Sequence, residues 1–137
     1  MTSLYLLDTD VLVALLRNRG DAARPRLREA EGRVAVSSIS EMEVDYGIER
    51  SREPGRNRQA ADELLSLVEV IPFDTPAAIQ AGRIRAILAD RGEPIGPYDV
   101  LLAGHARSLG MVVVTHNVRE FSRVPGLEVE DWLSGEA

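Results

Sequence analysis

Short apolar runs alternate along the chain with segments whose apolar residues recur at helical spacing. The runs that predict strands are residues 4–7 (LYLL), 33–36 (RVAV), 68–73 (VEVIPF) and 111–114 (MVVV), and residues 127–132 (LEVEDW) predict a further strand at an edge. The run at 111–114 is the clearest, because it is uninterrupted and rich in β-branched residues, as expected for a strand buried on both faces. The pattern therefore indicates four or five short strands.

Helical patterns lie between these runs. An apolar helix is expected over residues 9–17, another begins at Ser40, and a third opens at residues 74–76. Strands that alternate with helices favour right-handed crossovers and a parallel sheet with helices on both faces. We therefore predict an α/β fold, a single domain over residues 1–137 with a central, mainly parallel sheet of four to five strands. The polar stretch at 51–59, which a Pro-Gly pair interrupts, is the expected mobile loop.

Composition narrows the class of protein. The 137 residues are enough for one domain with a buried core. The net charge of −6 disfavours non-specific nucleic-acid binding, but a nuclease with acidic metal ligands stays open, since bound cations would restore the charge. The absence of cysteine excludes disulfides and thiolate metal sites and fits a reducing compartment. Asp8 and Asp10 interrupt the first apolar run, which argues against a signal peptide or a membrane span, so we expect a cytoplasmic protein with no membrane contact.

Four acidic residues are expected at one edge of the sheet. In a parallel α/β sheet, the strand-to-helix junctions lie along the carboxyl ends of the strands, where ligands bind. Asp8 ends the first predicted strand, Glu43 lies in the first turn of the helix after the second, and Glu120 follows the fourth. The helix that carries Asp99 leads into the fourth strand, so its N-terminus starts at the same edge. Carboxylates from distant parts of the chain should therefore converge.

Each of these residues also has a simpler explanation. Asp99 suits the dipole in the first turn of its helix, Asp8 could cap the helix that follows it, and Glu120 could be a solvated surface residue. The capping-box spacing S-x-x-E occurs twice, in Ser40 with Glu43 and in Ser38 with Glu41. Together, however, the carboxylates would repel one another without a counter-ion. Oxygen ligands without thiolate or imidazole favour Mg²⁺, for which Mn²⁺ can substitute.

A site of this composition supports the hydrolysis of phosphodiester bonds. Divalent cations held by carboxylates orient and deprotonate a water molecule and neutralise charge on the phosphate. Neither histidine indicates a Ser-His-Asp arrangement. We expect a structural role for His105, inside its helix, while His116 lies at the edge of the sheet, where a substrate contact is the less favoured of two roles.

Longer blocks of sequence carry a family resemblance. DTDVL around Asp8, SSISEMEVDYG around Glu43, IGPYDVLLAGHARSLG around Asp99 and VVVTHNVREFSRVPGLEVEDW around Glu120 follow one another over nearly the whole chain. With these blocks the chain resembles the PIN-domain ribonucleases. It is similar in particular to the VapC toxins of bacterial toxin–antitoxin pairs, in the branch that cuts initiator tRNA.

The resemblance implies a Mg²⁺-dependent endoribonuclease toxin that cleaves structured RNA, tRNA above all, with the anticodon region of initiator tRNA as a candidate target. It places the catalytic positions on Asp8, Glu43, Asp99 and Glu120, with Asp8 and Asp99 as metal ligands. Glu43 rather than Glu41 matches the family glutamate, since an apolar residue and then a Tyr-Gly pair follow it. The resemblance also implies a homodimer and a cognate VapB-like antitoxin whose C-terminal segment blocks the site.

Some residues near these positions differ from those that the family usually carries. Asp10 stands where members usually carry Asn, so it is either an extra ligand or a tolerated substitution. Asn117 stands where many members carry the fourth Asp, which leaves Glu120 as the substitute. We expect Ser38, Thr115 and Asn117 to surround the ligands, and the two hydroxyls to orient carboxylates through hydrogen bonds.

Two other functions stay open at this stage. In an aspartyl phosphotransferase, the DTD motif would supply Asp8 as the nucleophile and Asp10 as the acid or base. Such enzymes usually place a lysine beside the phosphoryl group, but this chain has no lysine, and Leu12 stands where Thr or Val is expected. The second alternative is a non-catalytic binding module that retains the fold.

All 16 basic residues are arginine, and many of them fall into two groups. The first is Arg17, Arg19, Arg24, Arg26 and Arg28, and the second is Arg50, Arg52, Arg56 and Arg58. Such groups commonly form solvated helix faces. Otherwise one group would hold RNA phosphates and the other the antitoxin. Looped or single-stranded RNA would suit a shallow acidic site better than a duplex, because its backbone can bend.

Overall fold

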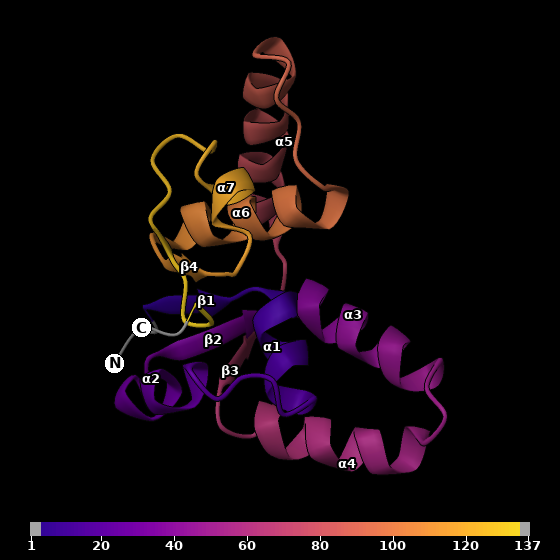
Figure 1. Ribbon diagram of the computed structural model, residues 1–137. Helices are drawn as coiled ribbons and strands as arrows, with labels where there is room; N and C mark the ends of the chain where they lie inside the picture. The colour runs from indigo at the N-terminus through magenta and orange to yellow at the C-terminus, as the bar shows by residue number, and fades with distance from the viewer. Residues whose placement is uncertain (1–3, 135–137) are drawn as a thin grey trace.

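The structure, a computed structural model, describes residues 4–134 and is built on a five-stranded sheet (Figure 1). The strands are β1 (Tyr5–Leu7), β2 (Val34–Ser37), β3 (Glu69–Ile71), β4 (Val112–Val114) and β5 (Val129–Glu130), in the order β3-β2-β1-β4-β5. Every neighbouring pair is parallel, and Tyr5 of the central strand pairs with Val34 on one side and Val112 on the other. This confirms the predicted α/β fold with its parallel sheet.

Helices cover both faces of the sheet. They are α1 (Thr9–Leu16), α2 (Ala23–Glu29), α3 (Ser38–Glu49), α4 (Pro54–Leu65), α5 (Thr75–Asp90), α6 (Pro97–Leu109) and α7 (Val118–Phe121). In Figure 1, α1 to α4 lie on one side of the strands and α5 to α7 on the other. No helix within residues 4–134 is long and apolar enough to span a membrane.

The strands separate two apolar layers, because successive side chains of a strand point to opposite faces. Leu7 and Val36 are buried in a layer with residues of α1, α3 and α4. Their neighbours Leu6 and Ala35 are buried in a second layer with residues of α5, α6 and α7. The helices α1, α3 and α7 directly follow β1, β2 and β4 in the chain, so they begin at the carboxyl edge of the sheet.

The prediction of a mobile loop at residues 51–59 is wrong, since α4 begins at Pro54. Proline at the first helical position needs no amide hydrogen, and its fixed φ angle suits a helix, so here it starts the helix. Ala61 and Leu64 of α4 are buried in the first apolar layer. The short helix α2 was not predicted either.

The helix after β2 begins two residues earlier than predicted. Ser37 is its N-cap and accepts a hydrogen bond from the backbone N–H of Ile39 at 3.0 Å, so α3 starts at Ser38 and not at Ser40. Neither S-x-x-E pair therefore begins at the N-cap. Glu43 lies in the second turn of α3, not the first.

The helix that carries Asp99 agrees with its prediction. α6 begins at Pro97 and ends at Leu109, and Gly110 follows with a φ of 68°, a left-handed conformation that favours glycine. This turn leads directly into β4. The N-terminus of α6 therefore lies at the carboxyl edge of the sheet, beside the ends of β1 and β4.

Candidate active site

Asp8 lies at the junction of β1 and α1, and only 4% of the residue is exposed. Its Oδ1 accepts a hydrogen bond from the backbone N–H of Thr9 at 2.7 Å, which makes Asp8 the N-cap of α1. Its Oδ2 accepts a hydrogen bond from the hydroxyl of Thr115 at 2.7 Å. Capping and a place in the acidic site are thus compatible roles for this residue.

The loop after β4 connects Asp8 to Asp99. Besides donating to Asp8, the Thr115 hydroxyl accepts a hydrogen bond from the backbone N–H of Asn117 at 2.8 Å. The side-chain amide of Asn117 donates to Oδ2 of Asp99 at 3.3 Å. Asn117 therefore supplies a donor at a place where another carboxylate would add negative charge.

Glu43 is held across the gap between α3 and α1. Its Oε1 lies 2.6 Å from the hydroxyl oxygen of Thr9, which also lies 2.8 Å from the hydroxyl oxygen of Ser40. Glu43 is half-buried, whereas Glu41 is exposed. Of the two glutamates at the start of α3, the structure brings Glu43 into contact with the β1–α1 junction.

Glu120 and Asp99 meet at the loop that precedes α6. The backbone N–H of Gly96 donates to Oε1 of Glu120 at 3.2 Å. A Cβ atom on Gly96 would lie 3.1 Å from Oδ2 of Asp99, which is closer than an ordinary van der Waals contact. Gly96 therefore leaves room for the Asp99 carboxylate while its amide holds Glu120.

The pKa values of Asp8 and Asp99 reflect both burial and the negative charge of neighbouring carboxylates. Burial raises the pKa of Asp8 to about 8, with further increases from the charges of Asp10 and Asp99. Burial also raises the pKa of Asp99, followed by the charge of Glu120 and then those of Asp10 and Glu43. The structure thus brings the four predicted acidic residues together and adds Asp10 to them.

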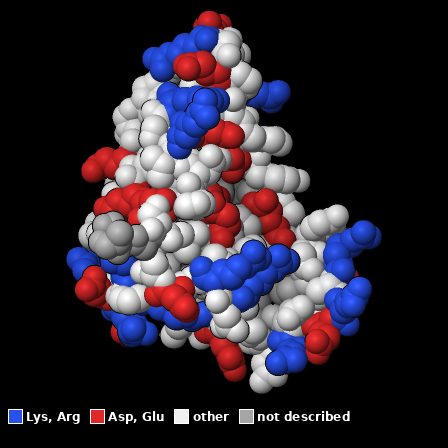
Figure 2. Space-filling view, in the orientation of Figure 1, with Lys and Arg blue, Asp and Glu red and all other residues white. Residues whose placement is uncertain are grey.

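Asp10 has an exposed side chain on α1, yet its crowded surroundings remove enough water from the carboxyl to raise its pKa. The charge of His116 opposes this rise. His116 is itself exposed, and its Nδ1 lies 3.1 Å from Oδ2 of Asp131. Figure 2 shows acidic side chains around a hollow on this face, between α1 and α3 on one side and α6 and α7 on the other.

The two serines Ser38 and Ser40 have other roles than predicted, whereas His105 has the expected one. Ser38 does not orient a carboxylate as predicted: its hydroxyl accepts a hydrogen bond from the backbone N–H of Phe73 at 2.9 Å. Ser40, fully buried, reaches the acidic group instead, through Thr9. His105 is also fully buried, with Nδ1 2.9 Å from the Ser37 hydroxyl, which agrees with a structural role.

Sequence reasoning missed Thr9, Ser40 and Gly96 as members of the site. The signal for Thr9 was its place between Asp8 and Asp10, and the signal for Gly96 was the Gly-Pro pair before Asp99. Ser40 carried no usable signal, because the S-x-x-E spacing assigned it to a helix cap. Only the packing of α1 against α3 shows that it faces Thr9.

The donor chemistry of this site fits a hard divalent cation. Its side chains offer carboxylate, hydroxyl and amide oxygens, which are the ligands that Mg²⁺ and Mn²⁺ prefer. Burial, and then the charges of Asp10 and Asp99, raise the pKa of Asp8, and a bound cation would oppose this rise by stabilising the ionised carboxylate. Within residues 4–134, no three His, Asp or Glu side chains are already gathered closely enough to hold an ion. Asp8 and Asp99, which hydrogen bonds link through Thr115 and Asn117, would be its ligands by the sequence prediction.

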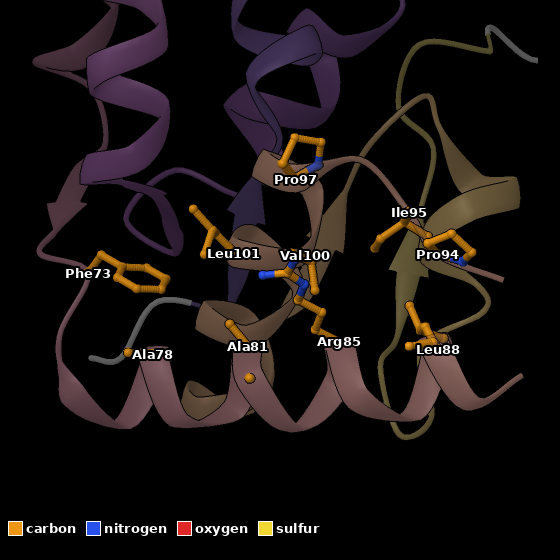
Figure 3. A pocket seen from close by; sticks show the side chains of 12 residues that line it. Phe73, Ala78, Ala81, Arg85, Leu88, Pro94, Ile95, Pro97, Val100 and Leu101 are labelled. Carbon is orange, nitrogen blue, oxygen red and sulfur yellow. The ribbon is translucent and has the colours of Figure 1, made fainter. Parts of the chain in front are cut away.

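The acidic site is separate from a large apolar pocket of about 800 Å³ between α5 and α6 (Figure 3). Phe73, Leu88, Ile95 and Leu101 are among its walls, and Arg85 is the charged residue that lines it. No carboxylate lines this pocket. It therefore offers apolar surface but no carboxylate that could hold a catalytic metal ion.

Several arginines of the two groups form ion pairs at the surface. Arg58 contacts Asp45 at 2.7 Å and Glu49 at 2.9 Å, and Arg26 contacts Glu130 at 3.0 Å. The guanidinium of Arg26 also lies 5.3 Å from the centre of the Trp132 ring. These arginines are partly engaged within the chain, which agrees with solvated helix faces more than with a continuous basic surface.

Comparison with known proteins identifies the family. The PIN domain model matches residues 5–127. The tRNA(fMet)-specific endonuclease VapC of Salmonella typhimurium is 46% identical over 128 residues, which cover 93% of this chain and 97% of that protein. Its counterpart from Shigella flexneri is 42% identical with the same coverage, and Ribonuclease VapC2 of Haemophilus influenzae is 36% identical over 94% of this chain and 98% of that protein.

The solved structures that are similar to this chain indicate the same family. The DNA-bound VapBC complex of Salmonella typhimurium contains a chain with a TM-score of 0.91 and 45% identity, covering 95% of this chain and 98% of that chain. VapBC2 of Rickettsia felis, bound to a DNA fragment from its promoter, contains one with a TM-score of 0.89 and 31% identity, covering 96% and 99%. The chain therefore belongs to the PIN-domain family and, within it, to the VapC ribonucleases.

Proposed function

We propose that this chain is the toxin of a toxin–antitoxin pair, an endoribonuclease that depends on Mg²⁺ or Mn²⁺ and cleaves tRNA. The observation that carries the proposal is the convergence of Asp8, Glu43, Asp99 and Glu120 at the carboxyl edge of the sheet, where burial and then the charges of Asp10 and Asp99 raise the pKa of Asp8 to about 8. Initiator tRNA is the leading candidate substrate, because two relatives over 40% identical are named as tRNA(fMet)-specific endonucleases.

In this proposal Asp8 and Asp99 hold the cation. A bound divalent cation would activate a water molecule and neutralise charge on the scissile phosphate. Thr115 and Asn117 fix the two ligands through their hydrogen bonds, so that the carboxylates keep their places when metal and RNA bind. Glu43 and Glu120 lie near Asp99 and would accept hydrogen bonds from the attacking water.

The partners follow from the same family relationship. Structures with TM-scores of 0.91 and 0.89 to this chain are VapBC complexes, so a cognate VapB-like antitoxin is the expected partner. We propose that the C-terminal segment of this antitoxin covers the acidic hollow and that the chain forms a homodimer. Arginine is well suited to such a blocking segment, because it pairs with carboxylates through two parallel hydrogen bonds.

The deciding experiment is the incubation of antitoxin-free protein with a total tRNA pool, with Mg²⁺ or with excess EDTA. Cleavage at one site of one tRNA with Mg²⁺, its loss with EDTA and its loss in Asp99→Asn would support the proposal. Ca²⁺ should not replace Mg²⁺, because its looser coordination positions water poorly. Robust cleavage in EDTA would overturn the role of metal. Hydrolysis of an aryl phosphate without RNA cleavage would favour a phosphotransferase, and binding of tRNA without cleavage would favour a non-catalytic module.

A further inference from the structure

Thr9 makes two short contacts that the acidic cluster alone does not explain. Its hydroxyl oxygen lies 2.6 Å from Oε1 of Glu43 and 2.8 Å from the hydroxyl oxygen of Ser40. The first separation is typical of a hydroxyl that donates to an ionised carboxylate, a bond shorter and stronger than one between neutral groups. Thr9 thus links the β1–α1 junction to the second turn of α3.

The number of protons determines the direction of these bonds. A threonine hydroxyl has one proton to donate, while an ionised carboxylate can only accept. The proton of Thr9 therefore goes to Glu43, and the contact with Ser40 requires that the Ser40 hydroxyl donate to Thr9. The three groups form a relay in which Ser40 donates to Thr9 and Thr9 donates to Glu43.

Burial makes this relay costly to break. Ser40 is 0% exposed, so water cannot easily replace a lost partner of its hydroxyl. Thr9 is the first residue of α1, directly after the N-cap Asp8, and its position is therefore coupled to that of the Asp8 carboxylate. The relay consequently sets the position of Glu43 relative to Asp8.

We propose that Thr9 and Ser40 are positioning residues that align the Glu43 carboxylate with the metal site, an inference that rests on the function proposed above. The Thr9 hydroxyl contacts Oε1 of Glu43, so in this proposal Oε2 is the oxygen left for the cation or its water. Without the hydroxyl, Glu43 would sample other rotamers, and the site would lose a carboxylate oxygen held in place for the cation or its water. Partners that orient metal ligands in this way typically change metal affinity or activity about 10–100-fold when they are removed.

Three variants test the relay. Thr9→Val keeps the shape of the side chain and removes the hydroxyl, Thr9→Ser keeps the hydroxyl, and Ser40→Ala removes the outer donor. Thr75→Val is the matched control, because Thr75 is likewise the first residue of a helix that an aspartate N-cap precedes, and its side chain is exposed. Each variant is measured for its Mn²⁺ dissociation constant by calorimetry without RNA, for kcat and KM on tRNA, and for its melting temperature.

We expect Thr9→Val to weaken Mn²⁺ binding and to lower kcat, each by about tenfold or more, with little change in KM for RNA. Thr9→Ser should stay within a few-fold of wild type, Ser40→Ala should fall between the two, and Thr75→Val should match wild type. In a Glu43→Gln background, Thr9→Val should add much less than it does in wild type, because both changes act on the same carboxylate.

Equal losses in Thr9→Val and Thr9→Ser would overturn the relay, since the effect would then come from packing and not from the hydroxyl. A Thr9→Val protein with wild-type Mn²⁺ binding and kcat would overturn it as well. If Thr9→Val does not fold, Ser40→Ala decides alone: unchanged Mn²⁺ binding and kcat contradict the relay. A wild-type protein that neither binds Mn²⁺ nor cleaves RNA would overturn the proposed function itself, an outcome distinct from failure of the relay in an active enzyme.

Discussion

Glu43 and Glu41 are two residues apart on α3 and have opposite environments. Glu43 is half-buried and accepts the Thr9 hydrogen bond, whereas Glu41 is exposed. Glu43→Gln should reduce tRNA cleavage by about 100-fold or more, because the amide keeps the size of the side chain but loses its charge and basicity. Glu41→Gln should stay within a few-fold of wild type. Rates measured side by side test this, and a dead Glu41→Gln variant would show that the assignment of the two glutamates is reversed.

A second comparison concerns Glu120 and Asp10, the two candidates for a further acidic group. Glu120 accepts a hydrogen bond from Gly96 and is the largest charge contribution to the raised pKa of Asp99, while Asp10 is exposed. Glu120→Gln should therefore lose much of the cleavage activity. Asp10→Asn should lose little and should lower the pKa of Asp8, since it removes a neighbouring charge. Severe losses of cleavage in both variants would contradict this prediction and would indicate that Asp10 is a metal ligand.

Among the elements, the strands and the helices that begin beside them could be predicted, because β-branched runs and polar junctions mark them in the sequence. MVVV at residues 111–114 and the Asp-Thr-Pro start of α5 are examples. The exact start of α3 could not be predicted, since Ser37, Ser38 and Ser40 are all favourable N-cap residues. Which of them caps the helix depends on tertiary packing. α4 was missed because proline can begin a helix as well as end one.

The helical assignment of the segment after residue 53 leads to a test with glycines. Gly55 lies in the first turn of α4, and nothing in the described chain lies within 4 Å of a Cβ placed there. Gly55→Ala should therefore stabilise the protein by roughly 0.4–1 kcal/mol, mainly by restricting the unfolded chain. Gly110→Ala should destabilise it by about 1 kcal/mol or more, because the φ of 68° strains any residue with a Cβ. Thermal melts measure both, and a Gly55→Ala variant less stable than wild type would contradict the helix.

On the scale of the whole molecule, the meeting of distant carboxylates follows from topology alone. β1 and β4 are neighbours in a parallel sheet, so Asp8 and the loop with Thr115 emerge side by side, and α6 must begin near them to reach β4. This much could be predicted from the order of strands and helices. The contacts that orient the carboxylates could not be predicted, because they depend on which faces of α1 and α3 meet, and the packing of the two helices decides this.

Asp99 tests whether the acidic site limits the stability of the whole protein. As a residue that merely complements a helix dipole, it would stabilise α6 by about 0.3–1 kcal/mol. As one of several crowded carboxylates, it would do the opposite without metal. Two unit charges about 5 Å apart at an effective dielectric near 20 repel by roughly 3 kcal/mol, before solvent screening and the partial protonation of Asp8 reduce the value. The raised pKa of Asp99, due to burial and then to Glu120, favours the second case.

Metal-free Asp99→Asn should therefore melt no lower than metal-free wild type at pH 7.5, because the lost repulsion offsets the lost dipole interaction. Mg²⁺ should reverse this order. At a hundred times its dissociation constant a ligand stabilises the folded state by about 2.7 kcal/mol, and the variant, which lacks one ligand, would gain less than wild type. Thermal melts of both proteins in EDTA and in Mg²⁺, with tRNA cleavage measured on the same preparations, make the comparison. A variant that melts lower in EDTA, gains as much from Mg²⁺ and still cleaves tRNA would reduce Asp99 to a residue that only starts a helix.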